Sequence, residues 1–433
     1  MDAETMYIES TGLRHDEAAA LGNRFLIGNG YLGVRGTLEE YGKDELTAVN
    51  LAGIYDRRGE GWREPLNAPN PWRAVPRFAG QAWRLPQHQP QAHVQRLDYS
   101  AALQERITTW YTPRGAFTVQ SLRFAAMHHV HLLGMAYTLR AEAGGPTQVA
   151  FSLDGDVWDI HGPHYERLDF FPAPYGVDVL TTATQGAQVA VALRLAEDTP
   201  CRVEVSPLSG TVSADVRLEP GQPLTLHTLA AIYTSQDGPD PLALARQAVR
   251  DAQHAGFDAL LAAHRDAWRA LWQAARVEIE GDPDAEQALN YSIYHLLAIA
   301  PRHGRALSVA ARGLSGQTYK GAVFWDTEMF MLDFYLRALP DVARAVVDYR
   351  IQTLPGALEK ARQYGFAGAF YAWESQEGGL DACSDYNVTD VFTGRPVRTY
   401  FRDKQIHISA AVVYALMRVW RESDDLSLLT GGG

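Results

Sequence analysis

An aromatic ring next to a carboxylate occurs at two places in the chain. Trp325 precedes Asp326 at the head of an apolar run that reaches Leu336, and Trp373 precedes Glu374 in a glycine-rich stretch. Such a pair can bind a sugar, because the ring stacks on the C–H face while the carboxylate accepts hydrogen bonds from the hydroxyls. The alternative for both pairs is structural, a buried tryptophan and an acidic helix cap. An isolated pair favours the structural interpretation, whereas two pairs on loops of one region favour a shared site.

Two further patterns resemble binding motifs but favour structural roles. The stretch Gly28–Gly33 spells G-x-G-x-x-G, yet no βαβ alternation follows it. We therefore expect these glycines to permit tight backbone in a β-rich region. His128, His129 and His131 lie in or beside an expected strand, with no carboxylate or cysteine partner nearby. For them we expect a structural role and no metal site.

The composition is that of an ordinary globular protein and excludes several classes. The 433 residues carry a formal charge of -12 without a basic block, which argues against a nucleic-acid partner. Cys201 and Cys383 form neither a disulfide framework nor a metal spacing. No secretory leader and no apolar run of membrane-spanning length is visible. We expect a reduced, cytoplasmic protein that binds no membrane.

The order of hydrophobic patterns predicts a multidomain β + α protein. Residues 1–240 are expected to form an antiparallel β-sandwich, because β-rich runs alternate with Gly, Pro and Asp turns. Within this domain, residues 51–100 combine many aromatic residues with many Pro and Gly, and are expected to be a long irregular stretch. The clearest predicted strands are residues 130–139, 148–153, 188–195 and 212–218.

The second half of the chain is predicted to be helical. Asp240 and Pro241 are typical of a helix start, and residues 241–284 are expected to form a helical linker. Residues 285–433 then form a helical domain with glycine-rich loops. The two clearest helices there are expected at Pro340–Ala361 and Gln405–Trp420.

Several motifs, in this order along nearly the whole chain, resemble glycoside hydrolase family 65. This family contains inverting phosphorylases that act on maltose, trehalose, kojibiose or nigerose. The matching segments are Asn23–Gly36, Leu66–Trp72, Arg123–Phe124, Ala311–Gly316, Lys320–Glu328, Trp373–Ser375 and Gln405–Ile408.

The resemblance implies a fold, a reaction and a set of binding residues. The expected fold is an N-terminal β-sandwich, a helical linker and an α/α barrel of six helix pairs. Trp325 and Asp326 would hold the glucosyl unit, and Trp373 and Glu374 would lie near the substrate pocket, whereas Glu328 matches a framework position. The implied reaction converts an α-linked glucose disaccharide and inorganic phosphate to glucose 1-phosphate and glucose. No cofactor is implied, and a homodimer is compatible with the family.

The chain also departs from the family pattern. Ala322 replaces a histidine, and Gly378–Cys383 replaces an acidic stretch. The family's general acid lies in a Gly-Pro-Asp-Glu-Tyr-His motif that the chain lacks, and its phosphate-binding Lys-Gln pair lies further downstream than Lys404–Gln405. Fewer residues follow position 285 than the roughly 200 that twelve helices and their loops require.

We therefore expect an incomplete barrel, a chain without a catalytic residue of its own, and little or no turnover by residues 1–433 alone. Two alternatives stay open from the sequence. One is hydrolysis of an α-glucoside, as in trehalase-like relatives, and the other is a non-catalytic carbohydrate-binding protein.

Overall fold

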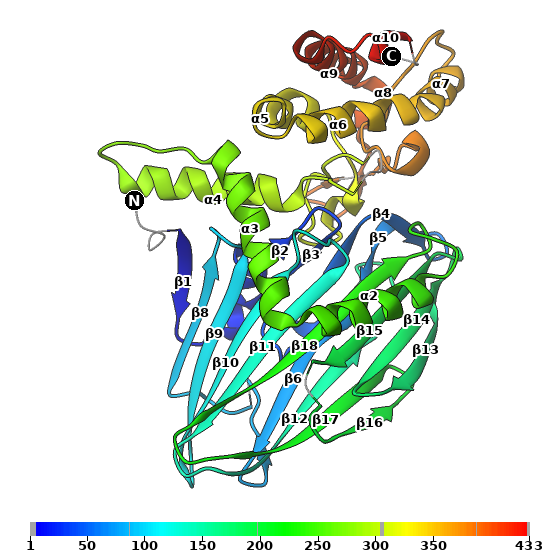
Figure 1. The fold of residues 1–433 in the computed structure, drawn as a ribbon. Helices are drawn as coiled ribbons and strands as arrows, with labels where there is room; N and C mark the ends of the chain where they lie inside the picture. The colour runs from blue at the N-terminus through cyan, green and yellow to red at the C-terminus, as the bar shows by residue number, and fades with distance from the viewer. Residues whose placement is uncertain (1–5, 86, 197, 304–306, 387, 431–433) are drawn as a thin grey trace.

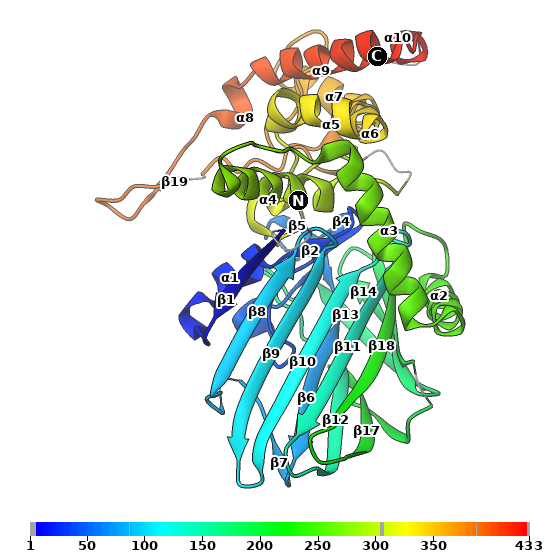
Figure 2. The same ribbon diagram turned by 60° about the vertical axis from the view of Figure 1, so that its left-hand side comes forward.

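The protein consists of a β-sandwich with a layer of helices above one end of it (Figure 1). The sandwich is followed by helices that lead from its outer face to the helical part (Figure 2). The computed structural model describes residues 6–85, 87–196, 198–303, 307–386 and 388–430.

Two antiparallel sheets face each other in the sandwich, which confirms the predicted class. Phe117 and Leu139 from the larger sheet and Phe151 and Val212 from the smaller one are fully buried in a common core. The larger sheet has the order β1 (Tyr7–Thr11), β8 (Ala92–Asp98), β9 (Leu103–Thr112), β10 (Gly115–Ala125), β11 (Leu132–Ala141), β18 (Pro223–Thr234), β15 (Gln188–Leu195), β14 (Gly176–Ala183) and β13 (Tyr165–Ala173). The smaller sheet has the order β16 (Cys201–Val205), β17 (Ser209–Leu218), β12 (Gly145–Asp154), β6 (Asn70–Phe78) and β7 (Gln81–Ala82).

The prediction that residues 51–100 are irregular is wrong. This stretch contributes β4 (Val49–Arg57), β5 (Arg63–Ala68), β6, β7 and β8. The prolines in β6 obscured the strand pattern. Because β7 pairs with β6 only at Arg77 and Phe78, most of β6 is an edge on that side, where Pro71 and Pro76 can be tolerated.

A small sheet at the end of the sandwich contains the glycine-rich stretch. It consists of β2 (Ile27–Gly28), β3 (Leu32–Val34), β4 and β5. Gly30 has φ +85°, and a Cβ atom there would lie 1.9 Å from the carbonyl oxygen of Ala300. As expected, the G-x-G-x-x-G pattern serves close backbone packing, here against the helical part.

Of the three histidines near the start of β11, His128 is exposed, and His129 and His131 are partly buried. His131 stacks on Tyr233, with ring centroids 3.8 Å apart, and its Nδ1 donates to the carbonyl of Ile232 at 2.9 Å. In the part of the chain that the structure describes, no group of three or more His, Cys, Asp or Glu residues is arranged to bind a metal ion.

The linker helices connect the sandwich to the helical part. They are α2 (Pro241–Ala255) and α3 (Phe257–Ala275), followed by α4 (Pro283–Ile299). Asp240 caps α2 by accepting a hydrogen bond from the backbone N–H of Ala243 at 2.9 Å. Helix α2 lies on the outer face of the larger sheet, where Val249 is buried in one cluster with Leu229 (Figure 2).

The helical part contains six further helices among the described residues. The predicted single helix Pro340–Ala361 is wrong, because the chain breaks at Thr353 before Pro355, which has no N–H to continue the hydrogen-bond ladder. The helices are α5 (Leu332–Ala338), α6 (Pro340–Gln352), α7 (Leu354–Gln363), α8 (Phe401–Lys404), α9 (His407–Ser423) and α10 (Ser427–Thr430).

A hairpin of two short strands, β19 (Val388–Thr389) and β20 (Pro396–Val397), projects from the helical layer (Figure 2). None of the helices described is both long enough and apolar enough to cross a membrane.

A buried charge cluster joins the sandwich to the loop that precedes the helical part. The ring of His164 contacts Asp56 through Nδ1 at 3.1 Å and Glu64 through Nε2 at 3.0 Å, and all three side chains are fully buried. A neutral imidazole has only one N–H, so it can donate to both carboxylates only when it is protonated. Gln317 extends the cluster by donating to Asp159 at 2.7 Å.

This cluster predicts a pH-dependent stability. Burial raises the pKa of Asp159 from 3.8 to about 6. A raised pKa means that the folded state binds the proton more tightly than the unfolded chain, so the stabilisation is complete at low pH and is lost as the pH rises. The free energy of unfolding of the wild type, measured relative to Asp159→Asn, should therefore fall between pH 4 and pH 7.

Denaturant unfolding across this pH range checks the prediction. Asp156→Asn is the matched control, because the side chain of Asp156 is largely exposed and pairs with Lys43 at the surface. It should show no such fall relative to the wild type. A pH-independent difference between wild type and Asp159→Asn, or one that grows with pH, would contradict the prediction.

Candidate functional site

The two segments that carry the aromatic–carboxylate pairs are joined through their backbones. Val323 donates its N–H to the carbonyl of Ser375 at 2.9 Å, and Ser375 donates to Val323 at 3.0 Å. Two residues further along each segment, the rings of Trp325 and Trp373 both contact the ring of His407. The structure therefore brings the two predicted pairs, far apart in sequence, into one place.

The rings of the two tryptophans meet at a third residue, His407, in the first turn of α9. The centroid of His407 lies 5.0 Å from that of Trp325 and 6.3 Å from that of Trp373. Phe401 stacks on Trp373, at 5.3 Å and an interplanar angle of 15°, and so covers one face of that ring. Both tryptophans are only partly buried. The cluster presents aromatic surface to solvent, as a sugar-binding surface does.

Asp326 does not have the capping role that the structural alternative assigned to it. It precedes a short π-helix, Thr327–Met331, and makes no side-chain capping hydrogen bond. No described residue forms a hydrogen bond or ion pair with its half-buried carboxylate. Short π-helical turns are frequent at functional sites. The carboxylate is thus free to accept hydrogen bonds from a ligand beside Trp325.

Glu374 is held by a lysine. Its carboxylate accepts a hydrogen bond from Lys320 Nζ at 2.7 Å, and both side chains are more than nine-tenths buried. Lys320 also donates to the carbonyl of Ala382 at 2.8 Å. Burial raises the pKa of Glu374, and the charge of Asp381 adds to this, whereas Lys320 opposes it. Glu374 is therefore fixed in position within the cluster.

Asp381 fixes the backbone of the loop that carries Trp373 and Glu374. Its carboxylate accepts hydrogen bonds from the N–H groups of Trp373, Glu374 and Cys383, at 3.0–3.3 Å. It also forms a buried ion pair with Lys360 at 2.6 Å. Asp381 lies in Gly378–Cys383, the segment where the sequence departs from the family pattern, and its contacts order this loop.

A second buried ion pair supports the segment around Trp325. Arg350 donates from Nε and Nη2 to the two carboxylate oxygens of Glu328, at 2.7 and 2.9 Å. Nη2 also donates to the carbonyl of Phe324 at 3.2 Å. Because both oxygens of Glu328 are engaged with a permanently charged partner, this carboxylate is a framework group and not a proton donor.

The sandwich holds the start of the same segment. Gln317 donates to the carbonyl of Pro65 at 2.8 Å, and Tyr55 donates to the carbonyl of Gly321 at 2.9 Å. Between these anchors Tyr319 and Lys320 adopt φ values of 60° and 58°, a left-handed conformation that is unfavourable for residues with a side chain. Such strain persists only where surrounding contacts impose it.

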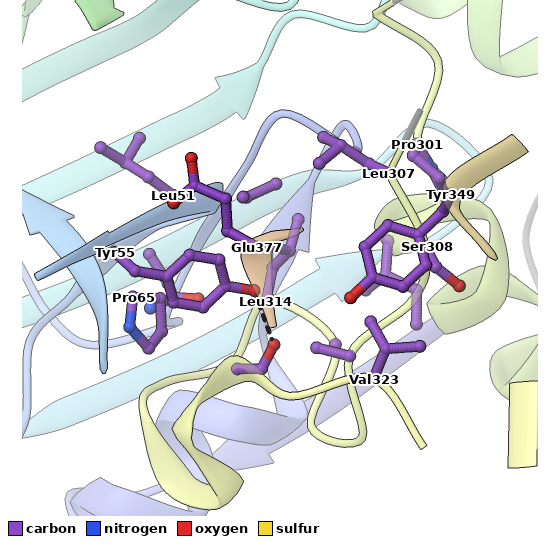
Figure 3. Close-up of a pocket in the computed structure, with 18 of the residues that line it drawn as sticks. Leu51, Tyr55, Pro65, Pro301, Leu307, Ser308, Leu314, Val323, Tyr349 and Glu377 are labelled. Carbon is purple, nitrogen blue, oxygen red and sulfur yellow. Dashed lines mark hydrogen bonds between the residues drawn. The ribbon is translucent and has the colours of Figure 1, made fainter. Parts of the chain in front are cut away.

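A cavity of about 630 Å³ lies between the sandwich and the helical part (Figure 3). The rings of Tyr55 and Tyr349 stand on opposite sides of it, and Val323 and Glu377 also line it. None of the four predicted binding residues lines this cavity. Both tyrosine hydroxyls donate hydrogen bonds to neighbouring chain segments, and the cavity lies at the boundary between the two domains.

The sequence therefore identified four residues that the structure places together, and their binding roles stay predictions. Sequence reasoning missed Lys320, Asp381 and His407 as members of the site. Lys320 and His407 lie inside segments quoted for the family resemblance, Lys320–Glu328 and Gln405–Ile408, so the signal was present there. Asp381 had no such signal.

Two family models together match most of the chain. Residues 8–271 match the glycosyl hydrolase family 65 N-terminal domain, and residues 290–433 match the family 65 central catalytic domain. A protein from the human microbiome, proposed to be a kojibiose phosphorylase, has a solved structure that matches 98% of this chain and 57% of its own with a TM-score of 0.86. At 17% sequence identity, this match shows the fold alone.

Several curated relatives are phosphorylases. Nigerose phosphorylase of Lachnoclostridium phytofermentans is 45% identical, over 98% of this chain and 60% of the relative. The 1,2-alpha-glucosylglycerol phosphorylase of Bacillus selenitireducens is 32% identical, over 95% and 54%. Kojibiose phosphorylase of Halothermothrix orenii is 30% identical, over 94% and 55%. The chain thus spans a little more than half the length of these relatives.

Proposed function

Because this chain belongs to glycosyl hydrolase family 65, we propose that the whole protein is a phosphorylase of an α-linked glucose disaccharide. Inorganic phosphate would take the glucosyl unit, and glucose 1-phosphate and glucose would be released. The observation that carries the assignment to this site is the carboxylate of Asp326 beside Trp325, which has no hydrogen-bond partner among the described residues, with Trp373 and His407 close by.

Within this function, Trp325 and Asp326 bind the glucosyl unit. The exposed part of the Trp325 ring offers an apolar surface to the C–H face of the sugar, and Asp326 accepts hydrogen bonds from its hydroxyls. Trp373 has one face covered by Phe401, so it contributes through its other face or its edge. Glu374 completes the cluster as a further hydrogen-bond acceptor.

The reaction is a displacement at the anomeric carbon. Phosphate is already anionic and attacks without a general base, while a protonated carboxyl group donates to the glycosidic oxygen as the bond breaks. Glu328 and Glu374 are both paired with buried cations, so we assign neither of them as the proton donor. The residues described here bind and orient the sugar. The co-substrate is phosphate, and no cofactor takes part.

Nigerose is the first substrate to test, since the nigerose phosphorylase shares 45% identity with this chain. Kojibiose, trehalose and maltose complete the panel. We propose a reducing cytoplasm as the compartment, since the two cysteines of the sequence give no disulfide framework. A homodimer is the oligomeric state to examine by light scattering.

A product assay tests the proposal. The whole protein, incubated with each disaccharide and phosphate, should release glucose 1-phosphate of β configuration, because a single displacement inverts the α-linkage. Proton NMR identifies the anomer. Free glucose formed without phosphate would identify a hydrolase, and binding without turnover would identify a carbohydrate-binding protein.

A further inference from the structure

The hairpin between β4 and β5 reaches from the sandwich into the candidate sugar site. Trp62, near its tip, lies with its ring over the ammonium of Lys320, 4.8 Å from the ring centroid. The next residue, Arg63, pairs with Glu377 at 2.6 Å and accepts a hydrogen bond from Gln376 at its carbonyl. The hairpin thus contacts both of the segments that carry the sugar-binding candidates.

Lys320 is the residue on which these contacts converge. Its Nζ holds Glu374 at 2.7 Å and the carbonyl of Ala382 at 2.8 Å, while its own carbonyl accepts from Gln376 at 2.7 Å. Its backbone is kept in the left-handed region at φ 58°. Such a backbone conformation persists only where surrounding contacts impose it, and these three hydrogen bonds are contacts of that kind.

The ion pair uses only part of the Glu374 carboxylate. Lys320 binds Oε2, whereas Oε1 accepts no hydrogen bond from any residue that the structure describes. Oε1 is also not one of the fully buried unpaired atoms, so it retains access to solvent. A carboxylate held by one oxygen with the other left open is oriented for a hydroxyl ligand.

We propose that Lys320 is a positioning residue of the sugar site, and that Trp62 of the β-sandwich holds Lys320 in place. Lys320 binds one oxygen of Glu374 and directs the other toward a sugar hydroxyl. This inference rests on the proposed function, because it assigns Glu374 to the substrate. It extends that function, because a residue of the N-terminal sandwich then contributes to sugar binding.

The test compares Lys320→Met with Lys320→Arg, which keeps the charge, and with Lys43→Met. Lys43 is the matched control, because it forms one exposed ion pair, with Asp156. Two measurements are made on each variant. Fluorine NMR of 5-fluorotryptophan protein, with the Trp373 signal assigned by Trp373→Phe, reports the loop without any ligand. Calorimetric titration with nigerose between pH 4 and pH 8 reports binding.

Lys320→Met should shift the Trp373 signal and weaken binding about tenfold or more, because a charge-assisted hydrogen bond is lost. The acid limb of the binding profile should also move to higher pH. Glu374 faces Lys320 and Asp381, which is itself paired with Lys360, so removing Lys320 leaves burial and a like charge to raise the pKa of the carboxyl further. Lys320→Arg should restore most of the binding, and Lys43→Met should behave as wild type.

Trp62→Ala gives an independent arm, because Trp62 is 43% exposed and its removal leaves the core intact. It should weaken binding about two- to fivefold through the lost cation–π contact, although it lies in the other domain. Unchanged nigerose binding and an unmoved Trp373 signal in Lys320→Met would overturn the inference. If Lys320→Met fails to fold, unchanged nigerose binding by Trp62→Ala would overturn it. If the wild type binds no sugar, the proposed function fails, while the Trp373 signal still decides whether Lys320 positions the loop.

Discussion

Replacing Arg350 by methionine should lower the free energy of unfolding of the helical part by about 3–5 kcal/mol. Arg350 is 1% exposed and Glu328 is also 1% exposed, so the variant leaves a carboxylate without a partner inside the protein. The same change releases the carbonyl of Phe324, directly before Trp325. Urea unfolding followed by far-UV circular dichroism at 222 nm checks this, since that signal reports mainly the helices.

The control for this variant is Arg344→Met on the same helix, α6. Arg344 is partly exposed and forms ion pairs with two partly exposed carboxylates, Asp348 at 2.8 Å one turn along the helix and Asp425 beyond the end of α9. Exposed pairs of this kind contribute at most about 1 kcal/mol, so the control should unfold close to the wild type. If Arg350→Met and Arg344→Met are equally stable, the Glu328–Arg350 pair does not stabilise the helical part, and the prediction is contradicted.

Replacing Asp326 by asparagine should weaken disaccharide binding about 10- to 100-fold, because hydrogen bonds to a charged acceptor are lost. The fold should be unaffected, since no described residue forms a hydrogen bond or ion pair with this carboxylate. Calorimetric titration with nigerose measures the affinity, and thermal unfolding measures the stability of the same sample.

Asp333→Asn is the matched control for Asp326→Asn. Asp333 lies on α5, is exposed, and pairs with Arg418 at 3.0 Å. It should bind nigerose as the wild type does. If both variants bind normally, Asp326 has no part in holding the sugar. If Asp326→Asn is also destabilised, the carboxylate has a structural role that the structure does not show.

The fold was predictable from sequence where one element carries its own pattern. The run Gln188–Leu195 is mostly apolar and has valines at two alternate positions, 189 and 191. It forms β15 with the predicted bounds. Strand β6 was missed because Pro71 and Pro76 disrupt its pattern, and its pairing with β12 joins residues far apart in sequence. Pro355 was a signal that the predicted helix Pro340–Ala361 is divided in two. We predicted one helix because the helical periodicity continues on both sides of this proline.

Only those residues of the site whose chemistry is recognisable from neighbouring positions in the sequence could be predicted. Trp325 and Asp326 are adjacent, so their combination is visible in the sequence. Lys320 and Glu374 are 54 residues apart, and their ion pair depends on the backbone bridge between Val323 and Ser375. Neither this bridge nor the approach of His407 leaves a local pattern, because both arise from tertiary packing.

The most direct test is a crystal structure of the protein with bound nigerose. We expect a glucosyl ring against Trp325, with its hydroxyls on the carboxylate of Asp326 and on Oε1 of Glu374. A sugar bound instead in the cavity between Tyr55 and Tyr349, with the Asp326 carboxylate left in solvent, would contradict the binding roles of Trp325 and Asp326.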